Sequence, residues 1–130
     1  MAKVVMEFEK GGSFEVVFNP DAPKTADAFR QALPVEGICL QGRYAGEEFF
    51  FNAPVETAPE NLVEASFGDV AFNSDPNWKA VCVYYGPKHR GGPYSLFARL
   101  EGDLGELNGI GLRIWKEGGE KVTVRELEMA

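Results

Sequence analysis

Histidine and cysteine are scarce in this sequence, which contains one histidine, His89, and two cysteines, Cys39 and Cys82. A single histidine leaves a histidine-based metal site without partners, and the many carboxylates follow no ligand spacing. Neither cysteine is paired with a recognisable base, and no serine lies in a Gly-x-Ser-x-Gly motif. Both cysteines fall in apolar runs typical of strands, so we predict two reduced, buried thiols. We predict no metal and no cofactor.

Positive charge is also in short supply, since 13 Lys and Arg residues stand against 20 Asp and Glu residues, a formal net charge of −7. Nucleic-acid binding depends on the neutralisation of phosphates by cationic side chains, so this balance argues against a nucleic-acid partner. The acidity instead promotes solubility and repels anionic surfaces.

Long apolar runs are absent, and none approaches the roughly 20 residues that a membrane-spanning helix needs. The first residues alternate the charged Lys3, Glu7 and Glu9 with apolar positions, unlike the apolar core of a signal peptide. We therefore expect a cytoplasmic location and no membrane partner. A chain of 130 residues is long enough for one domain with its own core, and we expect residues 1–130 to form a single domain.

Strand-like patterns dominate what is present. Residues 2–9 and 14–18 alternate apolar and polar side chains on either side of Gly11 and Gly12, which predicts a hairpin. Residues 80–85 are apolar on both faces, as in a strand covered from both sides. About eight antiparallel strands at this spacing favour a closed or nearly closed barrel, which leaves no exposed edges. The other expected strands are residues 37–41, 48–52, 69–72, 94–100, 121–127 and 62–65, the last either separate or continuous with 69–72 through a bend at Gly68.

One clear helical pattern interrupts the strands. Residues 22–33 carry an apolar stripe at spacings of four, three and four, and residues 19–21 offer a cap before it. A short helical turn is expected at residues 103–108, where residues 109–111 break it, and a short alternating piece follows at 113–116. The chain is therefore predicted to be mainly β, with one or two short helices that cap the barrel.

Two polar features are candidates for ligand binding. The basic, glycine-rich residues 86–93 are either an ordinary connection or a lid over a ligand, and they lack the spacing of a phosphate-binding loop. Arg43 could grip a carboxylate or carbonyl through two hydrogen bonds, or form a salt bridge with Glu47 or Glu48 across a turn.

Two stretches of the chain resemble cyclophilins. Residues 21–33, which begin Asp-Ala-Pro-Lys-Thr-Ala-Asp-Ala-Phe, are similar to the first helix of that family, with Ala28 where the family usually has Asn. Residues 96–107 resemble a later cyclophilin run, Val-Phe-Gly-(Lys/Arg)-Val-x-x-Gly-Met. Shorter motifs resemble those of compact bacterial and archaeal cyclophilin-like proteins of uncharacterised function, at residues 44–47, 68–70 and 85–86. The resemblance implies an eight-stranded cyclophilin-like barrel with a ligand cleft.

The resemblance leaves two functions open. The isomerase signature is incomplete, since residues 40–43 (Leu-Gln-Gly-Arg) have no histidine before Arg43, the only candidate for the catalytic arginine. The first hypothesis is a binding module that holds a small molecule or an extended peptide in the cleft, and the alternative is a weak peptidyl-prolyl isomerase. We expect a site around one concavity that favours an anionic or carbonyl-rich ligand. Its expected residues are Arg43, Glu47, Tyr85, Lys88, His89 and Arg90.

Overall fold

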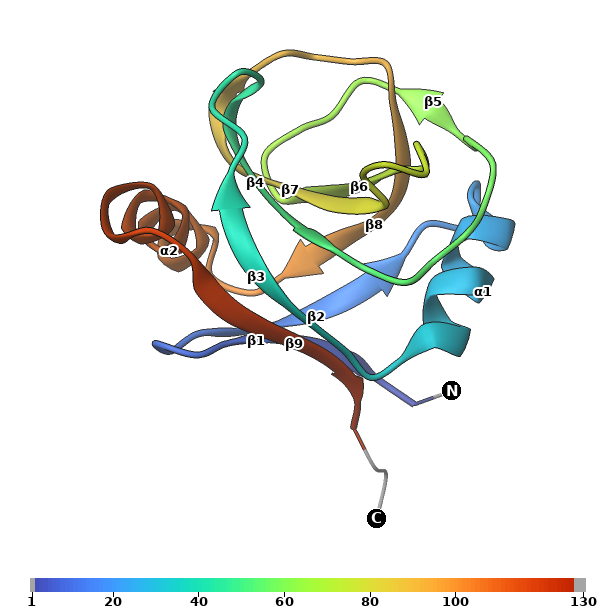
Figure 1. Cartoon of the computed structure of the whole chain (residues 1–130), viewed down its shortest axis with the longest axis horizontal. Coiled ribbons are helices and arrows are strands. Elements are labelled where there is room, and N and C mark those ends of the chain that lie inside the picture. The colour runs from blue at the N-terminus through green and yellow to red at the C-terminus, as the bar shows by residue number, and fades with distance from the viewer. Residues whose placement is uncertain (1, 128–130) are drawn as a thin grey trace.

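The predicted barrel is confirmed by the computed structural model, which describes residues 2–127. Eight strands close into an antiparallel barrel in the order β2-β1-β9-β3-β4-β7-β6-β8, and pairing of β2 with β8 completes the circle (Figure 1). A short additional strand, β5, pairs with the start of β8. In chain order the elements are β1 (Val4–Phe8), β2 (Ser13–Phe18), α1 (Pro23–Ala32), β3 (Val35–Gln41), β4 (Gly46–Asn52), β5 (Leu62–Val63), β6 (Asp69–Asn73), β7 (Ala80–His89), β8 (Tyr94–Glu101), α2 (Leu104–Glu117) and β9 (Glu120–Glu126).

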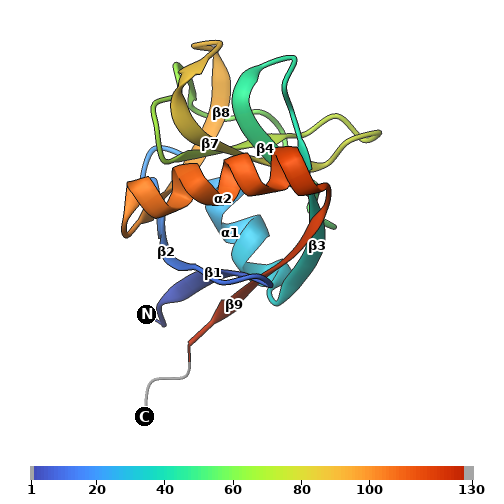
Figure 2. The same ribbon diagram turned by 90° about the vertical axis from the view of Figure 1, so that its left-hand side faces the viewer.

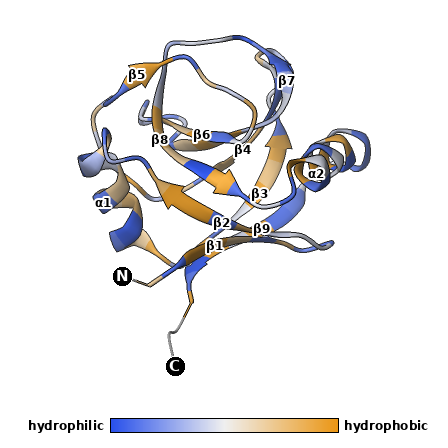
Figure 3. Cartoon of the chain, turned by 180° about the vertical axis from the view of Figure 1, so that it is seen from behind, coloured by the Kyte–Doolittle hydropathy of each residue, from blue (hydrophilic) through white to orange (hydrophobic). Residues whose placement is uncertain are grey.

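The barrel interior is a packed core. In the predicted hairpin, Met6 of β1 lies opposite Phe14 of β2, and both side chains are buried in the main apolar cluster. Phe29 of α1 and Ile110 of α2 join the same cluster, and the two helices lie on opposite sides of the barrel (Figure 1). Apolar colouring is strong on β2 and β3, whereas β9 and several turns of both helices are hydrophilic (Figure 3). Because side chains fill the interior, any ligand site must lie outside it.

The central strand β7 is covered on both faces, as its sequence predicts. Val83 and Tyr85 point into the barrel core, whereas Cys82 and Tyr84 belong to a second apolar cluster on the outer face of the sheet. This outer cluster includes Ala65, which lies in the long connection between β4 and β6. The connection therefore runs over the outer face as a strap, defined here as residues 53–66.

The two cysteines lie in different clusters, Cys39 in the barrel core and Cys82 in the outer cluster. Both are buried and unpaired, which confirms this part of the prediction.

Helix α2 differs from its prediction, because the expected short turn and alternating piece are one continuous helix (Figure 2). Asp103 caps its start by accepting hydrogen bonds from the backbone N–H groups of the next turn. Gly111 does not break the helix; the ring of Tyr85 occupies the space where a Cβ would lie, so the glycine allows close packing on β7. Across residues 2–127, no helix is long and apolar enough to cross a membrane.

Helix α1 occupies its predicted position, but the prediction of a cap within residues 19–21 is wrong. Its N-cap is Ala22, which offers no side-chain acceptor, and the Asn19 side chain instead accepts the N–H of Asp21 in a local turn. The carboxylate of Glu60, in the strap, accepts hydrogen bonds from the N–H groups of Lys24 (3.3 Å) and Thr25 (2.9 Å). An acidic side chain from a distant segment thus satisfies the free donors of the first turn.

Two predicted boundaries also change. Strand β7 continues to His89, so the connection to β8 is shorter than the expected loop over residues 86–93. Residues 62–63 and 69–73 are separate strands, which pair with different parts of β8.

Candidate functional site

Strand β4 places two adjacent glutamates on opposite faces of the sheet. Residues two apart in a strand share a face, so Glu47 lies on the face of Phe49, which points into the barrel. Glu48 lies on the face of Phe50, which packs against the outer cluster. The pairing of β4 with β7 shifts at this point, from Gly46 opposite His89 to Glu48 opposite Tyr84. Residues 85–88 of β7 therefore form a bulge opposite Glu47, and bulges commonly re-aim side chains beside functional sites.

Glu47 holds this bulge in place. Its carboxylate accepts a hydrogen bond from the backbone N–H of Lys88 (2.9 Å) and one from the Asn108 side chain of α2 (3.5 Å). Asn108 also donates to the backbone carbonyl of Tyr85 (3.0 Å). A Cβ at position 86 would overlap the Glu47 carboxylate, so only glycine fits there. Glu47 is thus a structural link between β4, β7 and α2.

Arg43 and Tyr85 meet on the same side, next to α2. The Arg43 guanidinium lies over the Trp115 ring, 4.0 Å from its centroid, and donates to the Tyr85 hydroxyl at 3.5 Å. That hydroxyl donates to the Gln41 side chain (3.1 Å), which in turn donates to the backbone carbonyl of Gly111 (2.9 Å). The arrangement fastens α2 to the barrel through a polar chain.

The three basic residues at the end of β7 diverge. Lys88 is exposed, and the His89 ring packs against the ring of Tyr84 with 4.8 Å between centroids. Arg90 donates its backbone N–H to the carbonyl of Ala45 (2.8 Å), which joins this connection to the β3–β4 turn. The structure therefore brings Arg43, Glu47 and Tyr85 together beside α2 and places Arg90 elsewhere, at the rim of a cavity.

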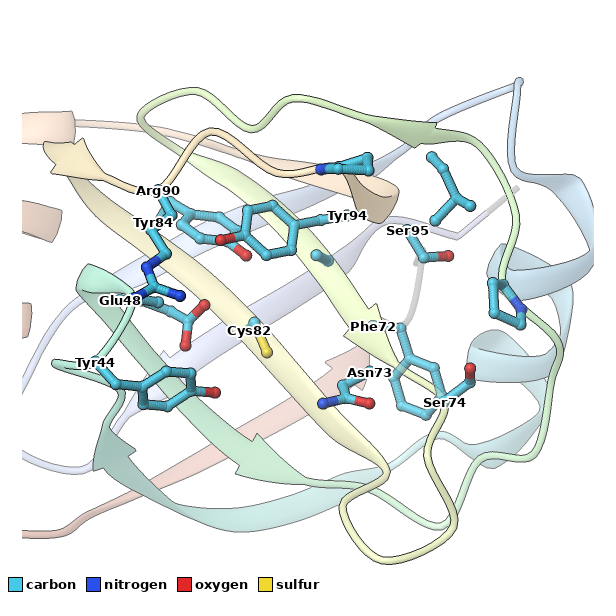
Figure 4. Close-up of a pocket in the computed structure, with 15 residues that line it drawn as sticks. Tyr44, Glu48, Phe72, Asn73, Ser74, Cys82, Tyr84, Arg90, Tyr94 and Ser95 are labelled. Atoms are coloured by element: carbon cyan, nitrogen blue, oxygen red, sulfur yellow. The ribbon is translucent and has the colours of Figure 1, made fainter.

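That cavity lies on the outer face of the sheet and has a volume of about 310 Å³. Cys82 and the rings of Tyr44, Tyr84 and Tyr94 face it (Figure 4). Ala71 of β6 and Pro59 and Leu62 of the strap also line it. Of the six residues expected to bind a ligand, Arg90 is the one that lines it. Its volume is at the small end of the range for ligand pockets, about 300–1,000 Å³.

Hydrogen bonds attach the part of the strap that lines the cavity to strand β8. The Ser95 hydroxyl of β8 donates to the backbone carbonyl of Glu60 (2.8 Å) and accepts the N–H of the same residue (3.0 Å). The Asn61 side chain donates to the carbonyl of Leu96 (2.9 Å). With the Glu60 carboxylate bound to the start of α1, the cavity wall is anchored to two elements.

Glu48 is the carboxylic acid among the residues that line the cavity. Its side chain is only 2% exposed, yet its Oε2 atom has no hydrogen-bond partner, and neither has the Tyr84 hydroxyl beside the same cavity. The Glu48 carboxyl points toward the space that Tyr44, Cys82 and Tyr94 also face (Figure 4). A Cβ at position 42 would overlap Oε2, so the glycine there makes room for it.

Burial decides the protonation of this site. It raises the pKa of Glu48 from 4.5 to about 7, because the low-dielectric surroundings penalise the carboxylate more than the nearby Tyr84 hydroxyl stabilises it. Burial also raises the pKa values of Cys82, Tyr84 and Tyr94, and the negative charge of Glu48 adds to each of these shifts. The thiol and both phenols therefore stay neutral near pH 7, where Glu48 changes its charge.

The sequence interpretation chose Glu47 and missed Glu48. Alternation along β4 shows that the two point to opposite faces, but it does not show which face carries a cavity, because the path of the strap has no sequence pattern. Within the described part of the chain, no group of three or more His, Cys, Asp and Glu side chains is placed to hold a metal ion.

Comparisons with known proteins agree on the fold. A family model described as cyclophilin-like matches residues 2–124. The structure of McbB in complex with tryptophan superimposes with a TM-score of 0.85 at 17% sequence identity, over 98% of this chain but 45% of that protein. The solution structure of the hypothetical protein AF2241 from Archaeoglobus fulgidus gives a TM-score of 0.63 at 26% identity, over 97% of this chain and 95% of that one. A comparison with curated proteins finds no match.

Proposed function

The chain belongs to the cyclophilin-like family, and we propose that it binds a small organic molecule in the cavity between the barrel's outer face and the strap. The observation that carries this proposal is the buried Glu48 carboxyl, which lines the cavity and whose Oε2 atom has no hydrogen-bond partner. Buried polar groups are almost always paired, and each exception needs an explanation. A ligand that donates a hydrogen bond to Glu48 supplies one.

The shape of the cavity favours a small molecule over an extended peptide. The strap crosses the outer face of the sheet and is fixed to β8 and α1. The space beneath it is therefore a pocket of about 310 Å³ and not an open groove. Aromatic walls with a few convergent polar groups are typical of small-molecule sites. McbB, a protein of the same fold that is about twice as long, has been determined in complex with tryptophan, which supports small-molecule binding by proteins built on this barrel.

Nothing in the geometry favours the alternative, a prolyl isomerase that uses Arg43. Such an enzyme needs a donor beside the bound proline. The Arg43 guanidinium instead lies on the Trp115 ring and bonds to Tyr85, outside the set of residues that line the cavity.

A fragment screen by two-dimensional NMR tests the proposal. Fragments that bind are expected to shift the amide signals of Ala71, Cys82 and Tyr94 together. Filling the cavity with Ala71→Leu or, independently, Cys82→Met should abolish these shifts. The matched control is Ala58→Leu, which adds the same side chain at an exposed strap position outside the cavity. If no fragment moves the cavity signals, or if binding survives both filled variants, the proposal is wrong.

A further inference from the structure

The polar groups of the cavity are distributed unevenly. The deepest of them is the Glu48 carboxyl, which is buried, whereas the cation nearest to the cavity, Arg90, is exposed at its rim. The rings of Tyr84 and Tyr94 line the cavity as well, with their centroids 5.3 Å apart. The interior is thus acidic and aromatic, the opposite of the anion-binding site expected from the basic residues.

We propose that the ligand carries a protonated amine on an aromatic or apolar body, and that the ammonium group binds the Glu48 carboxyl among the tyrosine rings. This inference rests on the proposed small-molecule function and names its ligand class. An ammonium group donates up to three hydrogen bonds, and Glu48 and Tyr84, which both line the cavity, each have a side-chain oxygen without a partner. The faces of tyrosine rings attract cations, and aromatic cages that hold ammonium groups use this attraction.

A carboxylate ligand fits the same space poorly. It would bring a second negative charge, or a second acceptor, against a buried carboxyl that already lacks a donor. A neutral ligand would leave the ionised form of Glu48 without a counter-charge, which is costly in a buried site. An amine removes both penalties, since it neutralises the carboxylate as it fills the cavity.

Other groups around Glu48 shape the expected pH dependence. Tyr44 of the β3–β4 turn, Cys82 and Tyr84 of β7 and Tyr94 of β8 have raised pKa values, chiefly through burial, and remain neutral as Glu48 ionises. The strap contributes the uncharged Pro59 and Leu62 to the lining. Arg90 keeps its positive charge at the rim, where solvent screens its repulsion of an incoming cation. If the ligand also carried a carboxylate, as an amino acid does, the positive charge of Arg90 would attract it.

Four indole compounds with the same ring test the inference by calorimetry and NMR. They are tryptamine, a cation; tryptophol, which is neutral; indole-3-propionate, an anion; and tryptophan, which carries both charges. At pH 8, tryptamine is expected to bind at least about tenfold more tightly than tryptophol, and indole-3-propionate more weakly than either, in line with a charge-assisted bond.

Variants locate the effect. Glu48→Gln is expected to remove the preference for tryptamine, whereas Glu36→Gln, on the exposed outer side of β3, leaves it unchanged. Arg90→Gln, an exposed change that does not depend on a tolerant core, should leave tryptamine binding nearly unchanged and weaken tryptophan binding if the carboxylate of tryptophan reaches the rim.

The pH profile gives an independent readout. From pH 6 to pH 8 the ionised fraction of Glu48 rises about tenfold, so tryptamine affinity should rise about tenfold while tryptophol affinity does not. His89→Gln is the control, because histidine side chains in general also titrate in this range.

The outcomes separate the two proposals. Equal or tighter binding of tryptophol or indole-3-propionate in the cavity would overturn the amine assignment and leave small-molecule binding intact. Tryptamine binding that is independent of pH and of Glu48→Gln would have the same consequence. If none of the four compounds shifts the cavity signals, the amine assignment fails, and the fragment screen alone then decides whether the cavity binds small molecules.

Discussion

Replacing Glu48 by glutamine is expected to stabilise the protein, and to do so only at neutral and alkaline pH. The folded-state pKa of Glu48 is raised to about 7, above its ordinary value of 4.5, because the carboxylate is buried. Stability linked to this group is therefore fully present below about pH 4.5 and is lost as the pH rises toward 7. In that interval the unfolded chain has released the proton while the folded chain still holds it.

The size of the effect follows from the shift in pKa. A difference of roughly 2.5 pH units corresponds to about 3 kcal/mol at about 1.4 kcal/mol per unit. The stability gained by Glu48→Gln relative to the wild type should thus grow by about 3 kcal/mol between pH 4 and pH 8. Glutamine retains the shape of the side chain and can donate to the unpartnered Tyr84 hydroxyl oxygen, so the gain is not offset by a cavity.

Urea denaturation of both proteins at pH 4, 5, 6, 7 and 8 measures this difference directly. Glu47→Gln is the informative comparison, since Glu47, on the other face of β4, accepts the Lys88 N–H and is less buried than Glu48. That variant should lose stability, because it replaces the carboxylate that holds the bulge. A constant difference between wild type and Glu48→Gln from pH 4 to pH 8 would show that Glu48 ionises normally, and the site would lose its main electrostatic argument.

Four further outcomes are expected. Arg113→Met should destabilise the protein by about 3–5 kcal/mol in urea denaturation, because Arg113 donates through two nitrogens (2.8 and 2.7 Å) to Glu120, whose side chain is fully buried. The double variant with Glu120→Leu should recover most of the loss. Equal losses in the single and the double variant would contradict this reasoning. In a protease-coupled assay on an Ala-Pro peptide, we expect little or no isomerase activity, and robust turnover that disappears in Arg43→Ala would reinstate the enzyme hypothesis. Cys39 and Cys82 should react with an aqueous thiol reagent only on unfolding, since burial raises the pKa of both thiols, and rapid labelling of the native protein would refute their burial. Hydrogen bonds from the Thr25 and Lys24 N–H groups lower the pKa of Glu60, so part of the stability should be lost as the pH falls below about 4.5, and Glu60→Gln should flatten this acid limb of the stability profile.

The elements that sequence reasoning placed correctly are those whose pattern is local. The first hairpin, α1 and the doubly covered strand β7 each carry their periodicity within a few residues, and each forms where it was predicted. Helix α2 was divided in error because Gly109 and Gly111 read as breakers. The reason for a glycine at position 111 is the ring of Tyr85 on β7, which occupies the space of a Cβ. A local sequence pattern does not show this contact.

The site shows the same limit. The β3–β4 turn and the end of β7 were expected to lie together, and Gly46 does pair with His89. The acceptor that caps α1, Glu60, lies about 35 positions away from the helix it serves. The face that carries the cavity depends on the strap, whose course is set by the contacts of Ser95 and Asn61 with distant backbone. Interactions of this kind have no signature in a single sequence.

The two glutamates of β4 show how the fold supports a site that it does not use for its own stability. Glu47 accepts bonds that hold the bulge of β7 and tie it to α2, and removing it would disturb the strand that carries Tyr84. Glu48, one residue later, has a free oxygen, a raised pKa and a glycine that makes room for it. A buried carboxyl that lowers stability at neutral pH and has an unpartnered oxygen fits the proposed binding role better than a role in folding. The bulge positions the cavity wall, the strap closes it, and the unpartnered Glu48 oxygen is where a ligand has most to contribute.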